Sequence, residues 1–374
     1  MKNSNNMRFV TLIVLFAIVR LGFPQAPLPF LRGGDVSEIP EVEAAGGVYF
    51  YQGKPTDPFA IMHDAGWNFV RLRVWNDPKG GWCDKAHTLA LAKRAVKAGM
   101  KISLDFHYSD WWADPNKQNP PAKWKGLSTD QLADKIYSYT KDVMQAMIDQ
   151  GTRPFMVQIG NEITFGMLWP NGKVSGKAPE AWKPLVKLIT AGHRALKEVE
   201  GSEHIQTMIH LDRGADNKGA RLWFDNAIAN GLTFDTIGLS YYPVFHGSIS
   251  AMESNVNDLA TRYKKDIYII ETGYPWTIDA HTMSSEHVEG DKTGLVPEFP
   301  PTPIGQRDYL SRLIKTIQAM PNHRGKGLLY WAPTWISTKQ MPSPYDNLAL
   351  FDYHGNALPG VNILGGTKKQ PEEH

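Results

Sequence analysis

The alternation of short strand-like runs with longer helical segments is the feature of this sequence that most restricts its fold. Eight runs rich in apolar and β-branched residues are separated by segments in which apolar side chains recur at helical spacing. The predicted strands are residues 30–39, 68–75, 101–108, 154–161, 204–212, 234–242, 266–271 and 326–331. This order of elements is typical of a parallel sheet wound with helices.

The predicted helices lie between these runs, at residues 57–66, 84–98, 128–150, 180–200, 219–230, 250–265 and 304–319. The clearest begins after Ser128, which forms a capping box with Gln131, and ends at Gly151. Eight strands with intervening helices predict an α/β fold of the (β/α)8 TIM-barrel type, in one domain with long βα loops. A doubly wound open sheet is the alternative, but no glycine-rich phosphate-binding turn follows the first strand.

Charge and cysteine content exclude several classes of function. Forty Lys and Arg residues against thirty-eight Asp and Glu residues give a net charge of +2, which is too small to steer nucleic acid or an anionic membrane to the chain. The single cysteine, Cys83, cannot form an intrachain disulfide, a cysteine-rich zinc site or an iron–sulfur cluster. We therefore expect no nucleic-acid partner, and separately we expect a monomer.

The N-terminal segment has the pattern of an export signal. Lys2 and Arg8 precede an apolar run at residues 9–19, which is too short to span a bilayer but suits the central region of a signal peptide. We predict a signal peptide at residues 1–28 and a barrel domain at residues 29–374 with no membrane span. The expected destination is the periplasm, the cell surface or the medium.

Polar and aromatic residues gather at the C-terminal ends of the predicted strands, where the chemistry of a barrel of this kind is located. Strand interiors such as residues 267–270 are apolar, so the ionisable groups collect at one end. The candidate site residues are Asp35, Arg73, Asp105, His107, Asp110, Trp112, Asn161, Glu162, His210, Tyr241, Glu271 and Trp331.

Two glutamates in this set form a candidate catalytic pair. Glu162 ends the fourth predicted strand and Glu271 ends the seventh, so the two side chains can converge from nearly opposite walls of the barrel. A facing pair of carboxyl groups is what hydrolysis of a glycosidic bond requires, because one donates a proton to the leaving oxygen and the other acts as nucleophile. A non-catalytic glycan-binding barrel is the alternative from another class, and it predicts that one carboxylate is missing; neither is.

Several longer motifs carry a resemblance to a known family. In chain order they are Gly34-Asp-Val-Ser37, Val70-Arg-Leu-Arg-Val-Trp-Asn-Asp-Pro78, Leu104-Asp-Phe-His-Tyr-Ser-Asp-Trp-Trp-Ala-Asp-Pro115, Gln158-Ile-Gly-Asn-Glu162, Ser240-Tyr-Tyr-Pro243 and Glu271-Thr-Gly-Tyr-Pro275. From about residue 33 to about residue 361 the chain resembles glycoside hydrolase family 53, the endo-β-1,4-galactanases. The nearest rival is an endo-hydrolase of the same barrel clan that acts on another β-linked polysaccharide.

The resemblance implies a reaction and its residues. It implies retaining hydrolysis of internal β-1,4-galactosidic bonds in galactan or the type I arabinogalactan of pectin, with no cofactor required. Glu162 would be the acid/base, Glu271 the nucleophile, and Asn161 a ligand of the sugar 2-hydroxyl group. We expect Arg73 to keep Glu271 charged and oriented.

The other candidate residues suit a sugar, which has apolar faces and a polar rim. Trp112 and Trp331 are predicted as platforms for sugar rings, and Asp35, Asp105, His107, Asp110, His210 and Tyr241 as hydrogen-bonding groups. Asp105, His107 and Asp110 also offer hard metal ligands, and that alternative stays open. Some members of the family bind calcium in the loop after the seventh strand, but residues 279–283 of this chain keep only part of that pattern.

Overall fold

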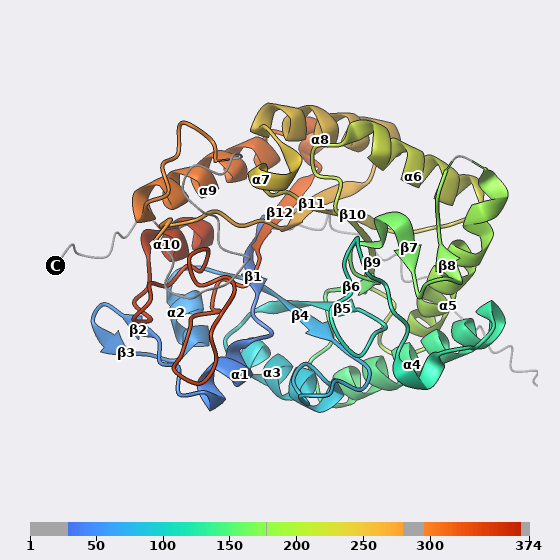
Figure 1. Ribbon diagram of the computed structural model, residues 1–374, viewed down its shortest axis with the longest axis horizontal. Coiled ribbons are helices and arrows are strands. Elements are labelled where there is room, and N and C mark those ends of the chain that lie inside the picture. Colours follow the sequence, from blue (N-terminus) through green and yellow to red (C-terminus); the bar gives the residue numbers. More distant parts are fainter. Residues whose placement is uncertain (1–28, 177, 280–294, 368–374) are drawn as a thin grey trace, which may run out of the picture.

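Eight parallel strands form a closed barrel at the centre of the molecule (Figure 1). The computed structural model describes residues 29–176, 178–279 and 295–367. Around the barrel the strands follow their order in the chain, and β1 closes the ring by pairing with both the second and the last strand. They are β1 (Leu31–Asp35), β4 (Phe69–Val74), β5 (Lys101–Phe106), β6 (Met156–Ile159), β9 (Gln206–Leu211), β10 (Thr236–Ser240), β11 (Asp266–Glu271) and β12 (Gly325–Tyr330). The predicted (β/α)8 barrel is confirmed.

Seven predicted helices form the outer ring in Figure 1. They are α2 (Pro58–Asp64), α3 (Lys85–Lys97), α4 (Thr129–Asp149), α5 (Lys183–Lys197), α6 (Asn217–Ala229), α8 (Ile249–Tyr263) and α9 (Pro303–Gln318). All but α5 begin after an Asp, Ser or Thr whose side chain accepts a backbone N–H of the first turn, and the capping box of Ser128 and Gln131 is present. None of the described helices has both the length and the apolar composition needed to cross a membrane.

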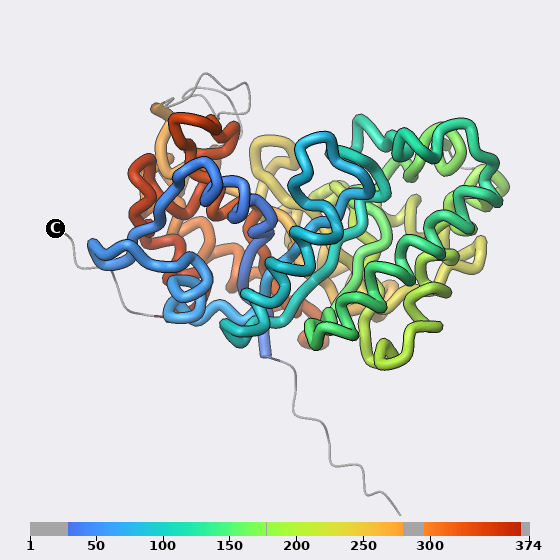
Figure 2. The backbone as a smooth tube through the Cα atoms, turned by 90° about the horizontal axis from the view of Figure 1, so that it is seen from below, coloured from blue at the N-terminus to red at the C-terminus, as the bar shows by residue number. Residues whose placement is uncertain are grey.

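Shorter elements that the sequence pattern did not indicate lie in the connections. They are the helices α1 (Ile39–Ala44), α7 (Pro243–His246) and α10 (Pro359–Gly365), the hairpins β2 (Phe50–Tyr51) with β3 (Lys54–Pro55) and β7 (Gly166–Met167) with β8 (Gly172–Lys173), and four single 3-10 turns. Segments of two to seven residues are too short for a periodic pattern to register. The C-terminal α10 lies beside the N-terminal part of the chain in Figures 1 and 2, and the Trp67 indole donates a hydrogen bond to the Val361 carbonyl oxygen at 2.9 Å.

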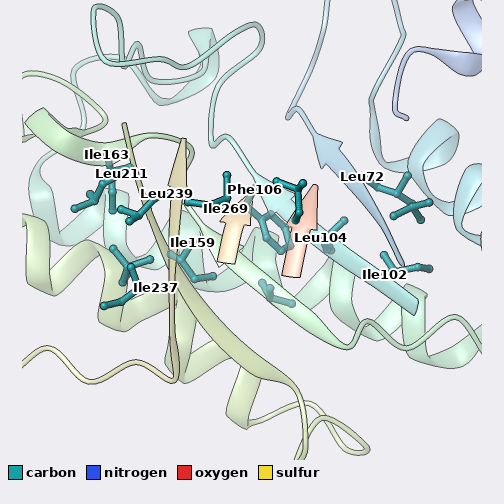
Figure 3. Packing of buried hydrophobic residues seen from close by; sticks show 14 of the residues in the cluster. Leu72, Ile102, Leu104, Phe106, Ile159, Ile163, Leu211, Ile237, Leu239 and Ile269 are labelled. Carbon is teal, nitrogen blue, oxygen red and sulfur yellow. The ribbon is translucent and has the colours of Figure 1, made fainter. Parts of the chain in front are cut away.

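Alternation along the strands divides the core into two parts. Outward-facing residues such as Leu72, Phe106 and Leu239 pack between the barrel and its helices, as Figure 3 shows. Inward-facing residues form a separate apolar cluster inside the barrel: Leu31, Phe69, Met156, Met208, Tyr268, Ile270 and Leu329. Further along the same strands the inward positions become charged, because Arg71 and Arg73 follow Phe69 on the inner face of β4. The apolar cluster therefore supports a buried polar layer.

Two predictions concern residues that lie outside the described ranges 29–176, 178–279 and 295–367. The signal peptide at residues 1–28 stays a prediction, and so does the outcome for calcium, since most of the relevant loop lies in residues 280–294.

Candidate active site

A cleft of about 880 Å³ opens over the polar layer at the C-terminal ends of the strands, and both candidate glutamates line it. Its walls come from loops far apart in the chain. The aromatic lining residues are Trp112, Phe165, Tyr242, Phe245, Tyr274, Trp331, Trp335 and Tyr345, and the polar ones include Asn161, Asp212 and Arg213. A cleft of this size and composition suits a ligand with apolar faces and polar edges.

An unusual backbone after β6 positions Glu162. Gly160 has φ +92°, and a Cβ there would lie 2.6 Å from Ile163 Cγ2, so the turn requires glycine. Glu162 itself has φ +46°, in the left-handed region that residues with a Cβ seldom adopt. Strained backbone of this kind is concentrated at functional sites, where the surrounding structure holds it in place.

A register shift places Glu271 opposite Ser240. The pairing of β10 with β11 runs from Leu239 with Ile269 to Ser240 with Glu271, so Ile270 is an extra residue. Ile270 stays in the apolar cluster inside the barrel, while Glu271 lines the cleft. Such bulges commonly redirect a side chain beside an active site. One oxygen of Glu271 and one of Glu162 lie within 4.8 Å of each other.

Glu271 is held by two groups. Arg71 Nη1 donates to Glu271 Oε1 at 2.6 Å, and the Tyr242 hydroxyl donates to Oε2 at 3.3 Å. Burial raises the pKa of Glu271 to about 7, and the charge of Arg71 opposes this shift.

Arg71, and not Arg73, is therefore the cation beside Glu271, which corrects the sequence-based prediction. Arg71 is fully buried and also ion-pairs with Asp35 at 3.2 Å and Asp105 at 2.8 Å. Arg73 instead ion-pairs with Asp35 at 3.1 Å, and its guanidinium lies 4.4 Å from the ring centre of Trp112. The two arginines share the inner face of β4, so strand alternation alone could not distinguish them.

Glu162 has a different environment. Its Oε1 is hydrogen-bonded to the Ser240 hydroxyl at 2.6 Å. Burial raises the pKa of Glu162 well above its ordinary value, and the negative charge of Glu271 adds to the increase. Arg71 opposes this shift but contacts Glu271 directly, so Glu271 ionises first and Glu162 keeps its proton.

Three of the residues predicted to bind substrate lie below the cleft instead. Asp35, Asp105 and His210 are fully buried among the charged groups around Arg71. Although burial opposes it, the Arg71 charge lowers the pKa of Asp105, so this carboxylate stays ionised. The prediction that these three side chains contact a sugar directly is therefore corrected: they support the floor of the cleft from below.

Three more predicted ligands also turn away from the cleft. His107 is almost fully buried, with Nδ1 accepting the Ala113 N–H at 3.2 Å. Asp110 accepts the backbone N–H groups of residues 77 and 122 and so shapes its own loop. The Tyr241 hydroxyl donates to the carbonyl oxygen of residue 247, and its neighbour Tyr242 takes the position facing Glu271, because successive strand residues point to opposite faces.

Three other predicted residues do line the cleft: Asn161, Trp112 and Trp331. The sequence reasoning missed Arg71, Ser240, Tyr242, Trp335, Tyr345, Phe165 and Phe245. Alternation along the strand could have found Tyr242, because residues two apart in a strand share a face and Tyr242 lies two residues after Ser240. The loop aromatics carry no such signal; Trp335 is stacked near Trp112, with ring centres 6.1 Å apart, across a long sequence separation.

Glu162, His210 and Glu271 have donor atoms close enough together to surround a metal ion. Their existing contacts fit a hydrogen-bonded cluster better. Nδ1 and Nε2 of His210 lie at hydrogen-bond distance from Asn161 and Ser240, and Glu271 is already paired with Arg71. These contacts therefore favour a hydrogen-bonded cluster over a metal centre at the three residues.

Comparison with known proteins agrees with this arrangement. The family model for glycosyl hydrolase family 53 matches residues 31–364. The protein named "Uncharacterized protein in bgaB 5'region" of Niallia circulans is 41% identical over 90% of this chain and 93% of its own. The arabinogalactan endo-beta-1,4-galactanase of Cellvibrio japonicus is 35% identical over 93% of this chain and 94% of its own.

A solved structure gives the same result. The GH53 catalytic domain of Ignisphaera aggregans superposes with a TM-score of 0.84 at 34% identity, covering 91% of this chain and 98% of that domain. The family match extends over nearly all the described residues, including every strand of the barrel. The chain is a glycoside hydrolase and belongs to glycosyl hydrolase family 53.

Proposed function

We propose that this protein is a retaining endo-β-1,4-galactanase in which Glu162 is the acid/base and Glu271 the nucleophile. The observation that carries the proposal is the pair of carboxyl groups at the floor of the cleft. An oxygen of each lies within 4.8 Å of the other, which is compatible with the separation of roughly 5–5.5 Å between the carboxyl groups of retaining enzymes.

The two environments assign the roles. Glu271 accepts hydrogen bonds from Arg71 and Tyr242, which favour the ionised form that a nucleophile needs. Glu162 lies apart from direct contact with Arg71, beside the Ser240 hydroxyl, and burial keeps its proton in place. Two carboxyl groups whose pKa values are separated in this way are typical of an acid and a nucleophile acting together.

The reaction has two steps. In the first, a Glu271 oxygen forms a bond to the anomeric carbon while the bond from that carbon to the glycosidic oxygen breaks, and Glu162 transfers its proton to the departing oxygen. In the second, Glu162 removes a proton from a water molecule, whose oxygen attacks the anomeric carbon and releases Glu271. The product keeps the configuration of the bond that was cut.

The named relatives and the shape of the cleft support the substrate. The Cellvibrio japonicus relative is named an arabinogalactan endo-beta-1,4-galactanase, and aromatic rings from several loops line the cleft together with both glutamates. Trp112, Trp331 and Trp335 lie close together, and Phe165 and Phe245 come from two other loops. Several such rings can hold more than one sugar unit, as internal cleavage of galactan or of the type I arabinogalactan of pectin requires.

Product analysis tests this proposal. Purified wild-type protein is incubated with linear β-1,4-galactan, galactomannan and carboxymethylcellulose beside Glu162→Gln, Glu271→Gln and the control Glu253→Gln, whose residue lies on α8 with a half-exposed side chain. We expect galactan oligosaccharides from the wild type and the control alone, first released as the β-anomer by proton NMR.

Other products would change the conclusion in defined ways. Release of the α-anomer would refute the retaining mechanism, and cleavage of another glycan would keep the mechanism but refute the substrate. Binding of galactan without any cleavage would favour a non-catalytic protein.

We also propose that the protein is exported. The apolar run at residues 9–19, preceded by Lys2 and Arg8, supports this. N-terminal sequencing of protein secreted by the producing cell should begin between residues 22 and 29. Retention of residue 2 in the mature protein would refute it.

A further inference from the structure

A line of hydrogen-bonded side chains connects the buried charges to Glu162. It contains Asn161, His210 and Ser240, which come from three neighbouring strand ends. Given the role of Glu162 proposed above, on which this inference rests, we propose that Ser240 and His210 are positioning residues that keep Glu162 protonated in the free enzyme.

The orientation of the Asn161 amide is the first step. Its Nδ2 donates to the Ala113 carbonyl oxygen at 2.8 Å, so its Oδ1 faces the opposite way. That oxygen accepts from Arg71 Nη2 at 2.6 Å and lies 3.0 Å from His210 Nδ1. Because an amide oxygen can only accept, this contact favours a proton on Nδ1 of His210, and it is shorter than the 3.5 Å contact of Arg71 Nη2 with the same nitrogen.

The second step concerns the other ring nitrogen. Burial and the nearby charge of Arg71 lower the pKa of His210 well below its ordinary value, so the ring is neutral and carries one proton only. Its Nε2 therefore presents a lone pair, and the nearest donor is the Ser240 hydroxyl at 2.8 Å. Ser240 has a single proton, which it donates to His210.

The third step fixes the state of Glu162. With its proton directed to His210, the Ser240 oxygen presents only lone pairs to Glu162 Oε1, 2.6 Å away. A contact this short needs a proton between the two oxygens, and Glu162 supplies it. If Glu162 ionised, Ser240 would have to turn its proton toward the carboxylate, and His210 Nε2 would be left buried without a donor. The arrangement thus favours protonated Glu162.

The surrounding charges act on the same groups and must be included in the test. The groups facing Glu162 are Glu271 on β11, Asp212 after β9, Tyr242 after β10 and Arg71 on β4. Those facing His210 are Arg71 and Asp105, with His107 after β5. None of these residues is altered in the variants below, so changes in the titration of Glu162 report on Ser240 and His210.

Sensitivity to the leaving group separates this role from a structural one. Aryl β-1,4-galactobiosides are compared, one with a dinitrophenyl group, which departs without protonation, and one with a phenyl group, which needs it. On the alkaline limb of the pH profile, we expect the ratio of kcat/KM for phenyl to kcat/KM for dinitrophenyl to fall by up to about 10-fold in Ser240→Ala and His210→Phe, because a pKa lowered by about one unit reduces the protonated fraction of Glu162 by that factor. The ratio is taken on one preparation, so the fraction of folded protein cancels.

Two further variants complete the comparison. Glu162→Ala should reduce the ratio at least as much, and Ser240→Thr, which keeps the hydroxyl group, should restore it. An unchanged ratio in Glu162→Ala would overturn the role proposed for Glu162 itself. A normal loss in Glu162→Ala with an unchanged ratio in Ser240→Ala and His210→Phe would overturn only the positioning role.

The pH profile gives a second prediction, and its sign depends on which of Ser240 and Glu162 donates the hydrogen bond between them. In Ser240→Ala and His210→Phe we expect the alkaline limb of kcat/KM for the phenyl substrate to move to lower pH by about one unit. The reason is that these variants remove more stabilisation from the protonated form of Glu162 than from its ionised form, which lowers the pKa of Glu162. A Ser240 hydroxyl that merely donated to the carboxylate would have the reverse effect. An alkaline shift in Ser240→Ala would therefore overturn the proposal.

Discussion

Replacing Arg71 with methionine tests whether the buried charges depend on one cation. The guanidinium contacts Glu271 at 2.6 Å, Asp105 at 2.8 Å and Asp35 at 3.2 Å, and all four side chains are almost completely buried. Methionine keeps much of the packed stem but leaves carboxylates in the interior without that partner. Removal of one member of a buried ion pair typically costs about 3–5 kcal/mol.

The magnitude can also be worked from protonation. The variant can limit its loss of unfolding free energy if one buried carboxylate takes up a proton on folding. This protonation costs about 1.4 kcal/mol for each pH unit by which the solution pH exceeds the carboxyl group's unfolded pKa of about 3.9. One such proton costs about 4 kcal/mol at pH 7 and about 1.5 kcal/mol at pH 5. Because the folded-state pKa of that carboxyl group is raised in the variant, its stability decreases as pH rises, and Arg71→Met should lose more at pH 7 than at pH 5.

The chain provides a matched control. Arg94 contacts Glu43 at 2.7 Å and Asp57 at 2.8 Å, but these side chains are partly exposed on the outside of the barrel. Arg94→Met should reduce the free energy of unfolding by about 1 kcal/mol or less. Urea denaturation followed by tryptophan fluorescence measures both variants against wild type at each pH. Equal losses for Arg71→Met at the two pH values, or a loss no larger than that of Arg94→Met, would refute the reasoning.

Three further changes have defined outcomes. Tyr242→Phe removes a hydrogen bond to the proposed nucleophile and should lower kcat on galactan about 3- to 10-fold, whereas Tyr241→Phe should reduce only stability, by about 1 kcal/mol in urea denaturation. Phe245→Ala and Phe165→Ala should each lower kcat/KM about 3- to 10-fold for long galactan oligosaccharides, with little effect on the shortest substrates. Burial raises the pKa of Glu38 to about 7, above its unfolded value of about 4.3, so wild-type stability should decline from about pH 5 to pH 7 relative to Glu38→Gln; parallel curves over that range would contradict this.

The alternation of eight strand-like runs with helical segments was enough to predict the barrel, and the positions of Glu162 and Glu271 at strand ends placed them at its mouth. Apolar residues recur with a period of two in a strand and near 3.6 in a helix, so both patterns can be recognised from the local sequence without knowledge of tertiary contacts. The failures share a cause. Alternation gives the face on which a side chain lies, but Arg71 and Arg73 lie on the same face of β4, and only the reach of each guanidinium across the barrel decides which one meets Glu271.

Depth along the barrel axis explains the remaining errors. Asp105 and His210 are paired within the strand ladders, at positions opposite Arg73 and Gly238, and such residues become part of the buried layer. Asn161 and Tyr242 lie beyond the last paired residues of their strands and line the cleft.

Glu271 is paired within its ladder and yet reaches the cleft, because the extra residue in β11 shifts its position. Register and bulges arise from pairing between strands distant in sequence, and no local pattern encodes them. In this barrel the shift brings Glu271 opposite Ser240, so one irregularity positions the proposed nucleophile beside the residue that contacts the proposed acid. A single inserted residue in β11 thus joins the two halves of the catalytic pair.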